Sequence, residues 1–537
     1  MSTVLHQWDD SDLKDMGPPG IPRPQRLAVS DSGMVSTQHY LATEAAVQIL
    51  DGGGNAVDAA VAAAFTLGVC EPAASGLGGQ TMMLIHLARS RRSFALDGSS
   101  RAPNRTSLKE LSRDQRRRGY RATTVPSTPA VLGYALEHYG TMLLNKVINP
   151  AIQLAENGYQ VSELQHKLTR RVRDVLKQSP ASELFLKSGK KTFRVGEKFC
   201  QSILAKTLRQ LSFLGIADFY TGRIARLIRK DMARNGGLIT DEDLAQIPWP
   251  IERKPVSCQF EDYRVVTFPP PGAGRTLVEL LNIISHIPKK YRNVDTPEGA
   301  LLLAQAIQQA NRDRTDRPFD PNFYAQVPQK RMLSTDYAKT IVRWSMRNIR
   351  THGDTTHLSV MDKFGNVVAL TQSIERVYGS CTASPELGFL YNNYMLAFED
   401  EDMTHPYYLR PNAVPWASVA PTIIFKNRRP WLAIGSPGSG RIVSSVAQVL
   451  LRLRNQLPFE AVDAPRLHCS VDGLVSLEAA RMRSDIPVAL EHHGFRVDIR
   501  DPYSFYLGCV QLVMREGDKF IGVADPRRDG SAGGPNE

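Results

Sequence analysis

The sequence predicts a layered protein in which β-sheets are covered by α-helices. Residues 431–434 form an apolar strand, and a glycine-rich turn and a helical segment at 442–453 follow it directly. This strand-then-helix order is typical of layered α/β folds. Residues 355–373 alternate and then turn back as a β-hairpin does. Residues 56–68 are apolar on nearly every side, so a helix formed there has to be buried. These segments together predict an α/β (α+β layered) fold.

The composition is that of a globular protein with a sizeable core. Of the 537 residues, 42% are hydrophobic and 22% are charged. The net charge of +12 and the pI near 9.4 suit an anionic partner. The arginines at 89–92 and 116–118, however, lie in segments typical of a turn and of a helix surface. This placement favours solvated faces over nucleic-acid binding, so we expect no nucleic-acid partner.

The six cysteines are far apart and predict neither a disulfide framework nor a metal site. The sequence has no Cys-x-x-Cys pair, no His-Glu-x-x-His motif and no phosphate-binding glycine loop. The neighbouring His492 and His493 have no further ligands close by in the sequence. We expect reduced, mostly buried thiols, no metal and no cofactor. The cysteines are Cys70, Cys200, Cys258, Cys381, Cys469 and Cys509.

The first 25 residues are polar and end in a proline-rich stretch, which predicts an arm on the surface. They lack the apolar centre of a secretory signal. No stretch of the chain approaches the ~18 apolar residues that cross a bilayer. The expectation is therefore a cytoplasmic protein without a membrane partner.

The first 240 residues are predicted to form two helices, then a pair of strands, then further helical segments. Residues 43–50 form an amphipathic helix that stops at the glycines 52–54, and Asn55 is suited to capping the next helix. The segments predicted after Asn55 are helix 56–68, strands 81–87 and 93–97, and helical segments 143–157 and 223–234.

The hairpin at 355–373 sets two hydroxyl groups opposite each other. If Asp362 and Asn366 flank a three-residue loop, the numbers of paired residues sum to 728, and Thr355 faces Ser373. A two-residue loop or a bulge shifts the partner by one residue. The β-carbons of facing residues lie about 5 Å apart.

The segment from Asp354 to Ser373, Asp-Thr-Thr-His-Leu-Ser-Val-Met-Asp-Lys-Phe-Gly-Asn-Val-Val-Ala-Leu-Thr-Gln-Ser, resembles the start of the small subunit in γ-glutamyltransferases (glutathione hydrolases). These are N-terminal-nucleophile (Ntn) hydrolases. The resemblance implies an αββα sandwich of two antiparallel sheets between helical layers. It also implies that the precursor cuts itself between Asp354 and Thr355. Residues 1–354 and 355–537 are then large- and small-subunit segments of one domain. Further motifs of the family follow in its order from about residue 27 to 528, among them 54–60, 76–79, 125–130, 269–274, 435–441 and 524–527.

Thr355 has the chemistry of the nucleophile that the resemblance makes it. A threonine hydroxyl needs a base, and a freed α-amine with a typical pKa of about 7.7–8.0 supplies one. The resemblance makes the loop at Gly438 and Ser439 the oxyanion hole, whose second residue is usually glycine. A backbone N–H survives the change to Ser439, and the following helix start adds the positive end of its dipole. An ordinary strand–helix turn is the alternative. Ser373 matches the family's second hydroxyl, normally threonine.

The positions expected to bind a substrate carboxylate depart from the family pattern. The γ-glutamyl pocket of the family has an arginine where this chain has Ser99, and Arg101 follows two residues later. The family's paired serines are Ala417 and Ser418 here. Ser99, Arg101 and Ser418 remain candidate substrate-binding residues.

The family's partners for the amino group of glutamate are also replaced, and their positions hold Glu375, Tyr394 and Ala397. Glu375 is still suited to binding an ammonium group, whereas Tyr394 fills space where a small amide would lie. Both stay candidates for substrate binding. We expect a substrate that is not a simple γ-glutamyl peptide such as glutathione, or is one handled poorly.

Three hypotheses about function remain open. The first is a γ-glutamyltransferase-like enzyme that attacks an amide or other acyl substrate and passes the acyl group to water or an amine acceptor. The second is an Ntn acylase or carbon–carbon hydrolase on a different substrate, in natural-product or secondary metabolism. The third is a non-catalytic family member, which the combination of Thr355, Ser373 and Gly438 argues against. The expected partners are a small-molecule acyl substrate, its acceptor and the two fragments of the precursor.

Overall fold

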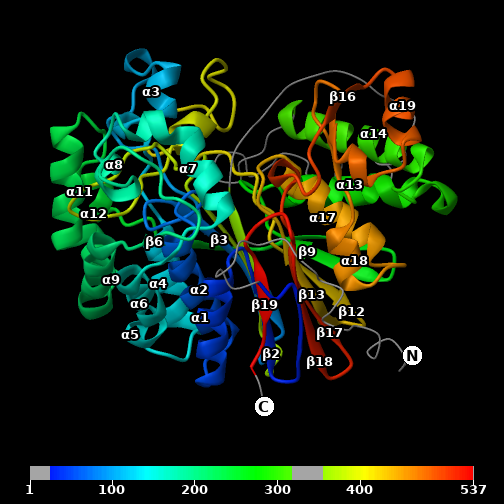
Figure 1. The fold of residues 1–537 in the computed structure, drawn as a ribbon, viewed down its shortest axis with the longest axis horizontal. Helices are drawn as coiled ribbons and strands as arrows, with labels where there is room; N and C mark the ends of the chain where they lie inside the picture. The colour runs from blue at the N-terminus through cyan, green and yellow to red at the C-terminus, as the bar shows by residue number, and fades with distance from the viewer. Residues whose placement is uncertain (1–23, 317–354, 536–537) are drawn as a thin grey trace.

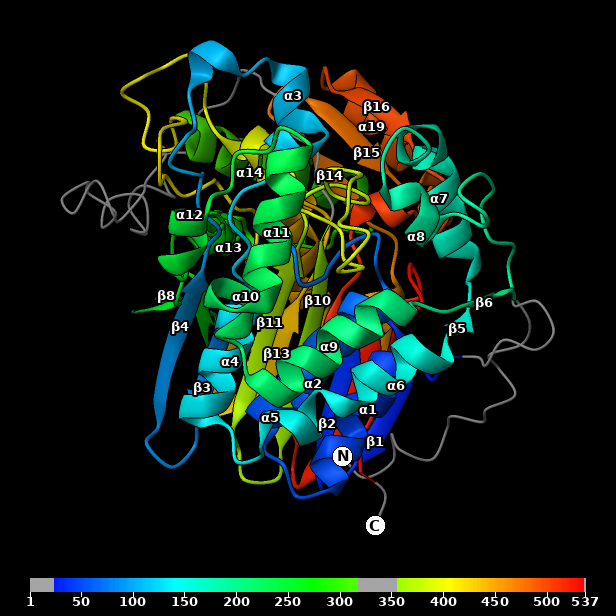
Figure 2. The same cartoon turned by 90° about the vertical axis from the view of Figure 1, so that its left-hand side faces the viewer.

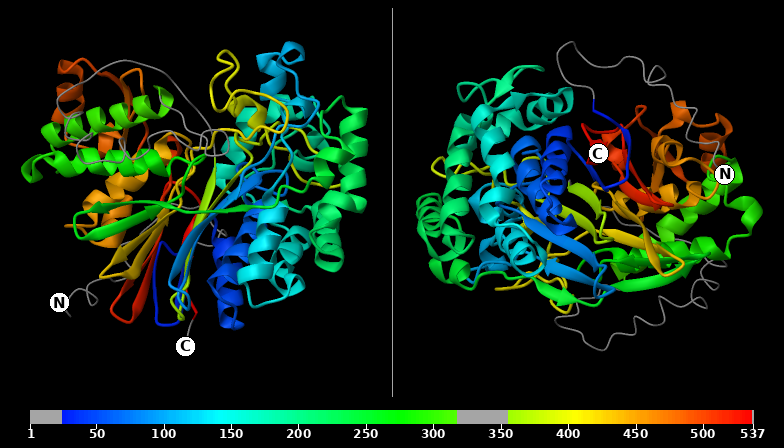
Figure 3. Two further views of the ribbon diagram at one scale, coloured as in Figure 1. Left: turned by 180° about the vertical axis from the view of Figure 1, so that it is seen from behind. Right: turned by 90° about the horizontal axis from the view of Figure 1, so that it is seen from below.

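Two antiparallel sheets are stacked face to face between two helical layers in the computed structural model, which describes residues 24–316 and 355–535 (Figure 1). Seen from below, the strands lie between helices on both sides (Figure 3). The predicted αββα sandwich is confirmed. Most of the predicted N-terminal arm (1–23) and Asp354 of the predicted cleavage site lie outside the described residues.

Each sheet has seven strands, and all neighbouring strands within it are antiparallel. The first sheet has the order β1 (Leu27–Ser30), β18 (Lys519–Ala524), β17 (Gln511–Glu516), β13 (Arg429–Gly435), β12 (Thr422–Lys426), β9 (Tyr263–Thr267), β8 (Val256–Phe260). The second sheet has the order β19 (Ser531–Gly533), β2 (Gly33–Thr37), β10 (Thr356–Asp362), β11 (Val367–Ser373), β3 (Gln80–Leu87), β4 (Arg92–Gly98), β7 (Ile251–Arg253).

One helical layer covers the second sheet, as Figure 2 shows for α1, α2, α6 and α9 in front of the strands. This layer contains α1 (Tyr40–Asp51), α2 (Ala56–Cys70), α4 (Thr128–Tyr139), α5 (Leu144–Val147), α6 (Asn149–Asn157), α7 (Glu163–Leu176), α8 (Ala181–Phe185), α9 (Ser202–Leu214), α10 (Asp218–Thr221), α11 (Arg223–Arg234) and α12 (Asp241–Ala245). The short helix α3 (Arg113–Arg117) stands at the upper end of the molecule in Figure 1.

The other helical layer covers the first sheet. It contains α13 (Gly274–His286), α14 (Pro297–Asp316), α17 (Arg441–Arg452), α18 (Pro458–Asp463) and α19 (Asp485–His492). Two small sheets complete the described chain: β14 (Leu467–Cys469), β15 (Leu474–Leu477) and β16 (Arg496–Ile499), and the pair β5 (Tyr159–Gln160) and β6 (Lys198–Phe199).

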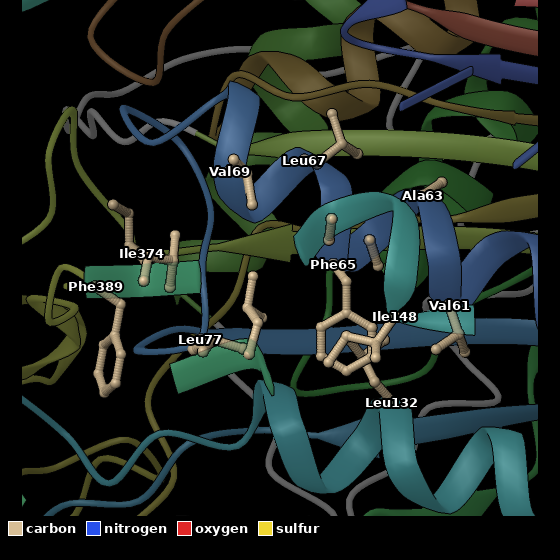
Figure 4. Close-up of a cluster of buried hydrophobic side chains, with 14 of the residues drawn as sticks. Val61, Ala63, Phe65, Leu67, Val69, Leu77, Leu132, Ile148, Ile374 and Phe389 are labelled. Carbon is tan, nitrogen blue, oxygen red and sulfur yellow. The ribbon is translucent and has the colours of Figure 1, made fainter. Parts of the chain in front are cut away.

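Helix α2 is the buried helix that its apolar sequence predicts. Asn55 caps it as predicted, through a capping box in which its side chain accepts from the N–H of Asp58 and the Asp58 carboxylate accepts from the N–H of Asn55. Figure 4 shows Phe65 of α2 directed toward Leu132 and Ile148, all within one core cluster. The same core cluster contains Leu358 and Val360 of β10 and Val368 and Leu370 of β11, on which α2 packs.

The two predicted segments of the chain are interleaved within both sheets. Strands from residues 24–316 pair with strands from 355–535 at five places: β1 with β18, β9 with β12, β19 with β2, β2 with β10, and β11 with β3. Neither segment contains all the strands of either seven-stranded sheet.

Two predictions need correction. The helical segment predicted at 143–157 is two helices, α5 and α6, which meet at Ile148. Pro150 has no N–H to donate, so it suits the start of a new helix rather than the interior of a continuous one. Arg116 does not lie on a solvated face, because its side chain is 3% exposed and forms an ion pair with Asp400.

The cysteines are free thiols as predicted, and four of the six are buried; Cys200 is exposed and Cys258 is partly exposed. Within the described ranges, no helix is both long and apolar enough to cross a bilayer.

Candidate active site

Four polar side chains form a row across the end of the second sheet. The hairpin has the predicted register, with Thr356 opposite Gln372. Extended by one residue, the same register sets Thr355 opposite Ser373. Ser373 pairs with Gln80 on β3, and Ser99 follows Gly98, which pairs with Thr81. Side chains alternate between the two faces along a strand. The odd-numbered residues of β10 and β11, and Thr355 just before β10, therefore point away from α2 and into the layer between the sheets. The two hydroxyls therefore meet in that layer.

The loop predicted as the oxyanion hole is brought to this end of the sheet by a close approach of two strands. A Cβ on Gly435, at the end of β13, would lie 2.2 Å from Cε1 of His357 on β10, so only glycine fits there. The chain continues from Gly435 into Gly438 and Ser439 and then into α17. The loop thus follows a point of contact two residues from Thr355.

Gly438 and Ser439 both have left-handed backbone, with φ of +116° and +53°. For a serine this conformation costs about 1–2 kcal/mol, which accounts for the glycine usual at this position in the family. Neither N–H donates a backbone hydrogen bond to any residue that the structure describes. Both donors lie near the start of α17, and an anion at that place meets the positive end of the helix dipole.

Arg528 holds Thr355 and is itself paired with Glu71, and the sequence did not predict either role. Nη1 of Arg528 donates to the carbonyl oxygen of Thr355 at 3.0 Å and to Oε1 of Glu71 at 2.8 Å. Arg528 is 3% exposed, and its guanidinium packs over the ring of Phe505. The family motif at 524–527 ends one residue before Arg528, so it could have pointed to Arg528. No sequence motif pointed to Glu71.

Ser373 is linked to two of the predicted substrate-binding residues. Its hydroxyl accepts a hydrogen bond from the N–H of Glu375 at 2.8 Å. Burial raises the pKa of the Tyr394 phenol well above its ordinary value, and hydrogen bonds with the side chains of Ser373 and Gln80 oppose that shift. Tyr394 is 2% exposed. The predicted residues Thr355, Ser373, Glu375 and Tyr394 thus form one cluster.

We expect Ser373→Ala to reduce turnover more than stability. Loss of a neutral hydrogen bond costs about 0.5–1.5 kcal/mol in the free energy of unfolding, whereas a bond that tightens in the transition state costs more in rate, here about tenfold or more. Urea unfolding and kcat/KM on the same processed protein give the two numbers. Ser373→Thr, the residue usual in the family, is the control and should retain turnover. Equal kcat/KM for Ser373→Ala and the parent would show that the hydroxyl only packs.

His357, next to the nucleophile, is fully buried and neutral. Its Nδ1 hydrogen-bonds with Oγ1 of Thr371 at 2.8 Å and its Nε2 with Oγ of Ser359 at 3.2 Å. Burial lowers the pKa of His357 from 6.5 to about 3. Burial also lowers the pKa of His39 to about 4, although Asp529 opposes that shift.

The protein should therefore lose stability in mild acid. Below pH 6.5 the unfolded chain takes up protons that folded His357 and His39 do not bind, so their contribution is complete above pH 6.5 and falls as the pH falls. Between pH 6.5 and 5 the loss is roughly 1.5 kcal/mol for each histidine. Urea unfolding at the two pH values measures it, and His357→Gln should show a smaller pH dependence. The same pH dependence in His357→Gln and the parent would contradict this account.

Ser99 and Arg101 line a separate cavity of about 240 Å³, together with Asp97, Arg253, Trp249 and Ile251. Both the hydroxyl and the N–H of Ser99 donate to Oδ1 of Asp97, and Arg253 forms an ion pair with the same carboxylate at 2.6 Å. Ser99 lies three strands from Thr355 in the row, which is roughly 14 Å at the usual strand spacing. Arg101 donates to Oδ1 of Asn412.

Ser418 lies beside an arginine that the sequence did not predict. Nη2 of Arg314, near the end of α14, donates to the carbonyl oxygen of Ala417 at 2.9 Å and to Oγ of Ser418 at 3.2 Å. Burial lowers the pKa of Arg314 to about 10, while the charges of Tyr407 and Glu375 raise it and that of Arg275 lowers it. The guanidinium of Arg314 thus lies in the electrostatic field of Glu375 as well as against Ser418.

No metal-binding cluster is found among residues 24–316 and 355–535, since nowhere there do three His, Cys, Asp or Glu side chains gather suitably.

The αββα layers define an Ntn hydrolase, a class of enzymes that hydrolyse or transfer acyl groups. A family profile described as Gamma-glutamyltranspeptidase matches residues 42–534. The chain belongs to the gamma-glutamyltranspeptidase family. The glutathione hydrolase proenzyme of Escherichia coli (strain K12) is 33% identical to it over 535 residues, which cover 92% of this chain and 90% of that protein. The acylase ACY 1 proenzyme of Pseudomonas sp. (strain SE83) is 34% identical over 539 residues and 94% of each chain.

Solved structures of both kinds resemble this fold. The cephalosporin acylase from Bacillus halodurans superimposes with a TM-score of 0.87 at 27% identity and covers 98% of this chain and 99% of its own. The gamma-glutamyltranspeptidase of Helicobacter pylori gives a TM-score of 0.54 at 36% identity over 58% of this chain and 91% of that chain. The overall identity is nearly the same for the glutathione hydrolase and the acylase, so it does not distinguish between these two activities. That distinction has to come from the residues of the pocket.

Proposed function

We propose that the chain is a self-processing acylase or acyltransferase whose nucleophile is Thr355. The observation that carries the proposal is the register of the β10–β11 hairpin. It sets Thr355 opposite Ser373 at the end of the second sheet. For processing, the hydroxyl of Thr355 attacks the carbonyl carbon of Asp354 and the peptide bond becomes an ester. Water then hydrolyses the ester, which leaves the Asp354 carboxylate and a free α-amine on Thr355.

The freed amine is the base of the catalytic cycle. It takes the proton of the Thr355 hydroxyl as the oxygen attacks the substrate carbonyl, and returns it to the leaving amine. The N–H groups of Gly438 and Ser439 stabilise the oxyanion, because no backbone acceptor among the described residues uses them. Water or a second amine then attacks the Thr355 ester and releases the acyl group. Arg528 fixes the main chain of Thr355 throughout.

The acyl group that fits best is one other than γ-glutamyl. Ser99 is turned to Asp97, and so it offers no positive charge to a carboxylate close to the nucleophile. The cavity beyond it holds Arg101 and Arg253 against the apolar walls of Trp249 and Ile251. This arrangement suits an acyl chain with a polar or carboxylate end and no ammonium group. A buried ammonium or carboxylate without a partner costs several kcal/mol, which disfavours the zwitterionic end of glutamate.

Matched p-nitroanilides test the proposal directly. γ-Glutamyl and glutaryl p-nitroanilide share a carboxylate and differ only in the ammonium group, and hexanoyl p-nitroanilide has neither charge. We expect the glutaryl or hexanoyl compound to exceed the γ-glutamyl compound in kcat/KM, and Arg101→Ala to reduce the glutaryl preference. A kcat/KM on γ-glutamyl substrates of about 10⁴ M⁻¹s⁻¹ or more, usual for a good enzyme, would overturn the specificity. Full turnover by Thr355→Ala would overturn the mechanism.

A further inference from the structure

Half of the net charge of this protein lies in one short segment. Residues 101–121 contain eight arginine and lysine residues and two acidic residues, a surplus of six, whereas the whole chain has +12. The segment starts at the Ser99 cavity and includes α3. Figure 1 shows α3 at the top of the molecule next to the yellow segment that follows β11, and the ion pair between Arg116 and Asp400 joins the two.

The segment is fixed to the candidate active site by the side chain of Asn393. Its Nδ2 donates to the carbonyl oxygen of Arg117 at 2.9 Å, and its Oδ1 accepts from the N–H of Arg376 at 3.1 Å. Arg376 follows Glu375, whose N–H donates to Ser373. The end of α3 is therefore connected to the second hydroxyl of the site through Asn393 and the adjoining residues Arg376 and Glu375.

Four arginines form what we call the basic rim: Arg113, Arg117, Arg118 and Arg376. The first three are exposed and Arg376 is half-buried. Burial lowers the pKa of Arg376, Glu375 raises it, and Arg117, Arg118 and Arg113 lower it further, so the four charges act on one another. Nε of Arg376 has no hydrogen-bond partner among the described residues.

Three of the four rim arginines form no ion pair with an acidic side chain of the described residues, whereas Glu375 acts on Arg376. Some exposed arginines elsewhere in the described chain are paired, as Arg209 is with Glu156, Arg483 with Asp485 and Arg496 with Asp472. Others, such as Arg89 and Arg91, form no ion pair there. Within the described part of the chain, Arg113, Arg117 and Arg118 have no such partner; only their buried neighbour Arg116 is paired. Like charges held together repel one another and raise the local concentration of anions.

We propose that the basic rim binds an amine carrying two or more carboxylates, such as an acidic peptide, on the amine side of the scissile amide. The amine side follows from exposure, because the acyl group occupies the cavity at Ser99 while the leaving or accepting amine extends toward solvent. The assignment of sides rests on the proposed function. Binding of an acidic peptide by the rim does not depend on that function. Binding and catalysis are therefore tested separately.

Binding is measured on the processed protein with rhodamine-labelled triglutamate and triglutamine, by fluorescence anisotropy. Arg117→Glu/Arg118→Glu removes rim charge, and Arg89→Glu/Arg91→Glu makes the same change in charge at the β3–β4 turn, at the far end of the second sheet. We expect triglutamate to bind at least about tenfold more tightly than triglutamine at low salt. The rim variant should lose that difference and the turn variant keep it. If charge reversal impairs folding, Arg117→Gln/Arg118→Gln replaces the rim variant, and its melting temperature shows whether it is folded.

Catalysis is measured with one acyl group joined either to Ala-Ala or to Glu-Glu. The rim variant should lose at least about tenfold more in kcat/KM on the acidic amide than on the neutral one, and added salt should reduce the parent's preference. Equal losses in the rim and turn variants would overturn the proposal, as would equal binding of the two peptides. Tighter binding of a single-stranded oligonucleotide that depends on the rim would overturn it in favour of nucleic acid. Rim-dependent triglutamate binding without amide turnover would count against the proposed function alone.

Discussion

Thr355→Ala should leave the protein as a single chain of 537 residues, whereas the parent should separate under denaturing conditions into fragments 1–354 and 355–537. Alanine has no hydroxyl to attack the carbonyl of Asp354, so the ester that water must hydrolyse cannot form. Intact mass spectrometry of both proteins after the same incubation measures the effect. This is the largest change in the protein that one substitution is expected to make.

Thr355→Ser is the matched control, because serine keeps a hydroxyl at the same place. It should be processed, at a different rate, into the same two fragments. A Thr355→Ala protein that still splits before residue 355 would show that the cut comes from another nucleophile or from a protease. The parent fragments should elute together in size-exclusion chromatography without denaturant.

Asp525→Ala should have the largest effect on stability. The Asp525 carboxylate is fully buried and accepts from Arg466, from the side chain and N–H of Arg527, and from the N–H of Val510. Burial alone would raise the pKa of Asp525, but the charges of Arg466 and Arg527 outweigh it and hold the pKa below its usual value. Removal of one member of a buried ion pair typically costs about 3–5 kcal/mol. Urea unfolding at pH 7 measures this loss.

Asp485→Ala is the control for that measurement. Asp485 also pairs with an arginine, Arg483, but both side chains are about half exposed, and such a pair contributes about 0–1 kcal/mol. We also expect Asp525→Ala to slow processing, because Arg528 is three residues away and holds Thr355. Equal stability losses in Asp525→Ala and Asp485→Ala would mean that the buried network is not needed for folding.

Local patterns predicted much of the fold correctly. Side-chain alternation and the turn at Asp362 gave the register that sets Thr355 opposite Ser373, because a pleated strand allows only two faces. Asn55 was identified as a cap because its short amide side chain reaches the first free N–H groups of a helix. The roles of Thr355, Ser373, Gly438 and Ser439 stay predictions that the geometry accommodates.

The rest depended on contacts between residues far apart in the chain. Arg528 reaches Thr355 across 173 positions, and Arg314 meets Ser418 across 104. No periodicity or local propensity describes such pairs. The short run at Arg116 was predicted as a solvated face because its partner, Asp400, is 284 residues away. The cavity at Ser99 likewise has walls from segments separated by more than 300 residues.

The interleaving of the two segments changes how the mature protein will unfold. Five strand pairings join residues before and after the cut, so once the chain is cut, complete unfolding also separates two polypeptides. Unfolding then becomes a dissociation governed by mass action, and its midpoint rises with protein concentration. The uncut Thr355→Ala chain unfolds as one molecule, and its midpoint has no such dependence. A single cleaved bond thus makes the stability of the mature protein depend on its concentration.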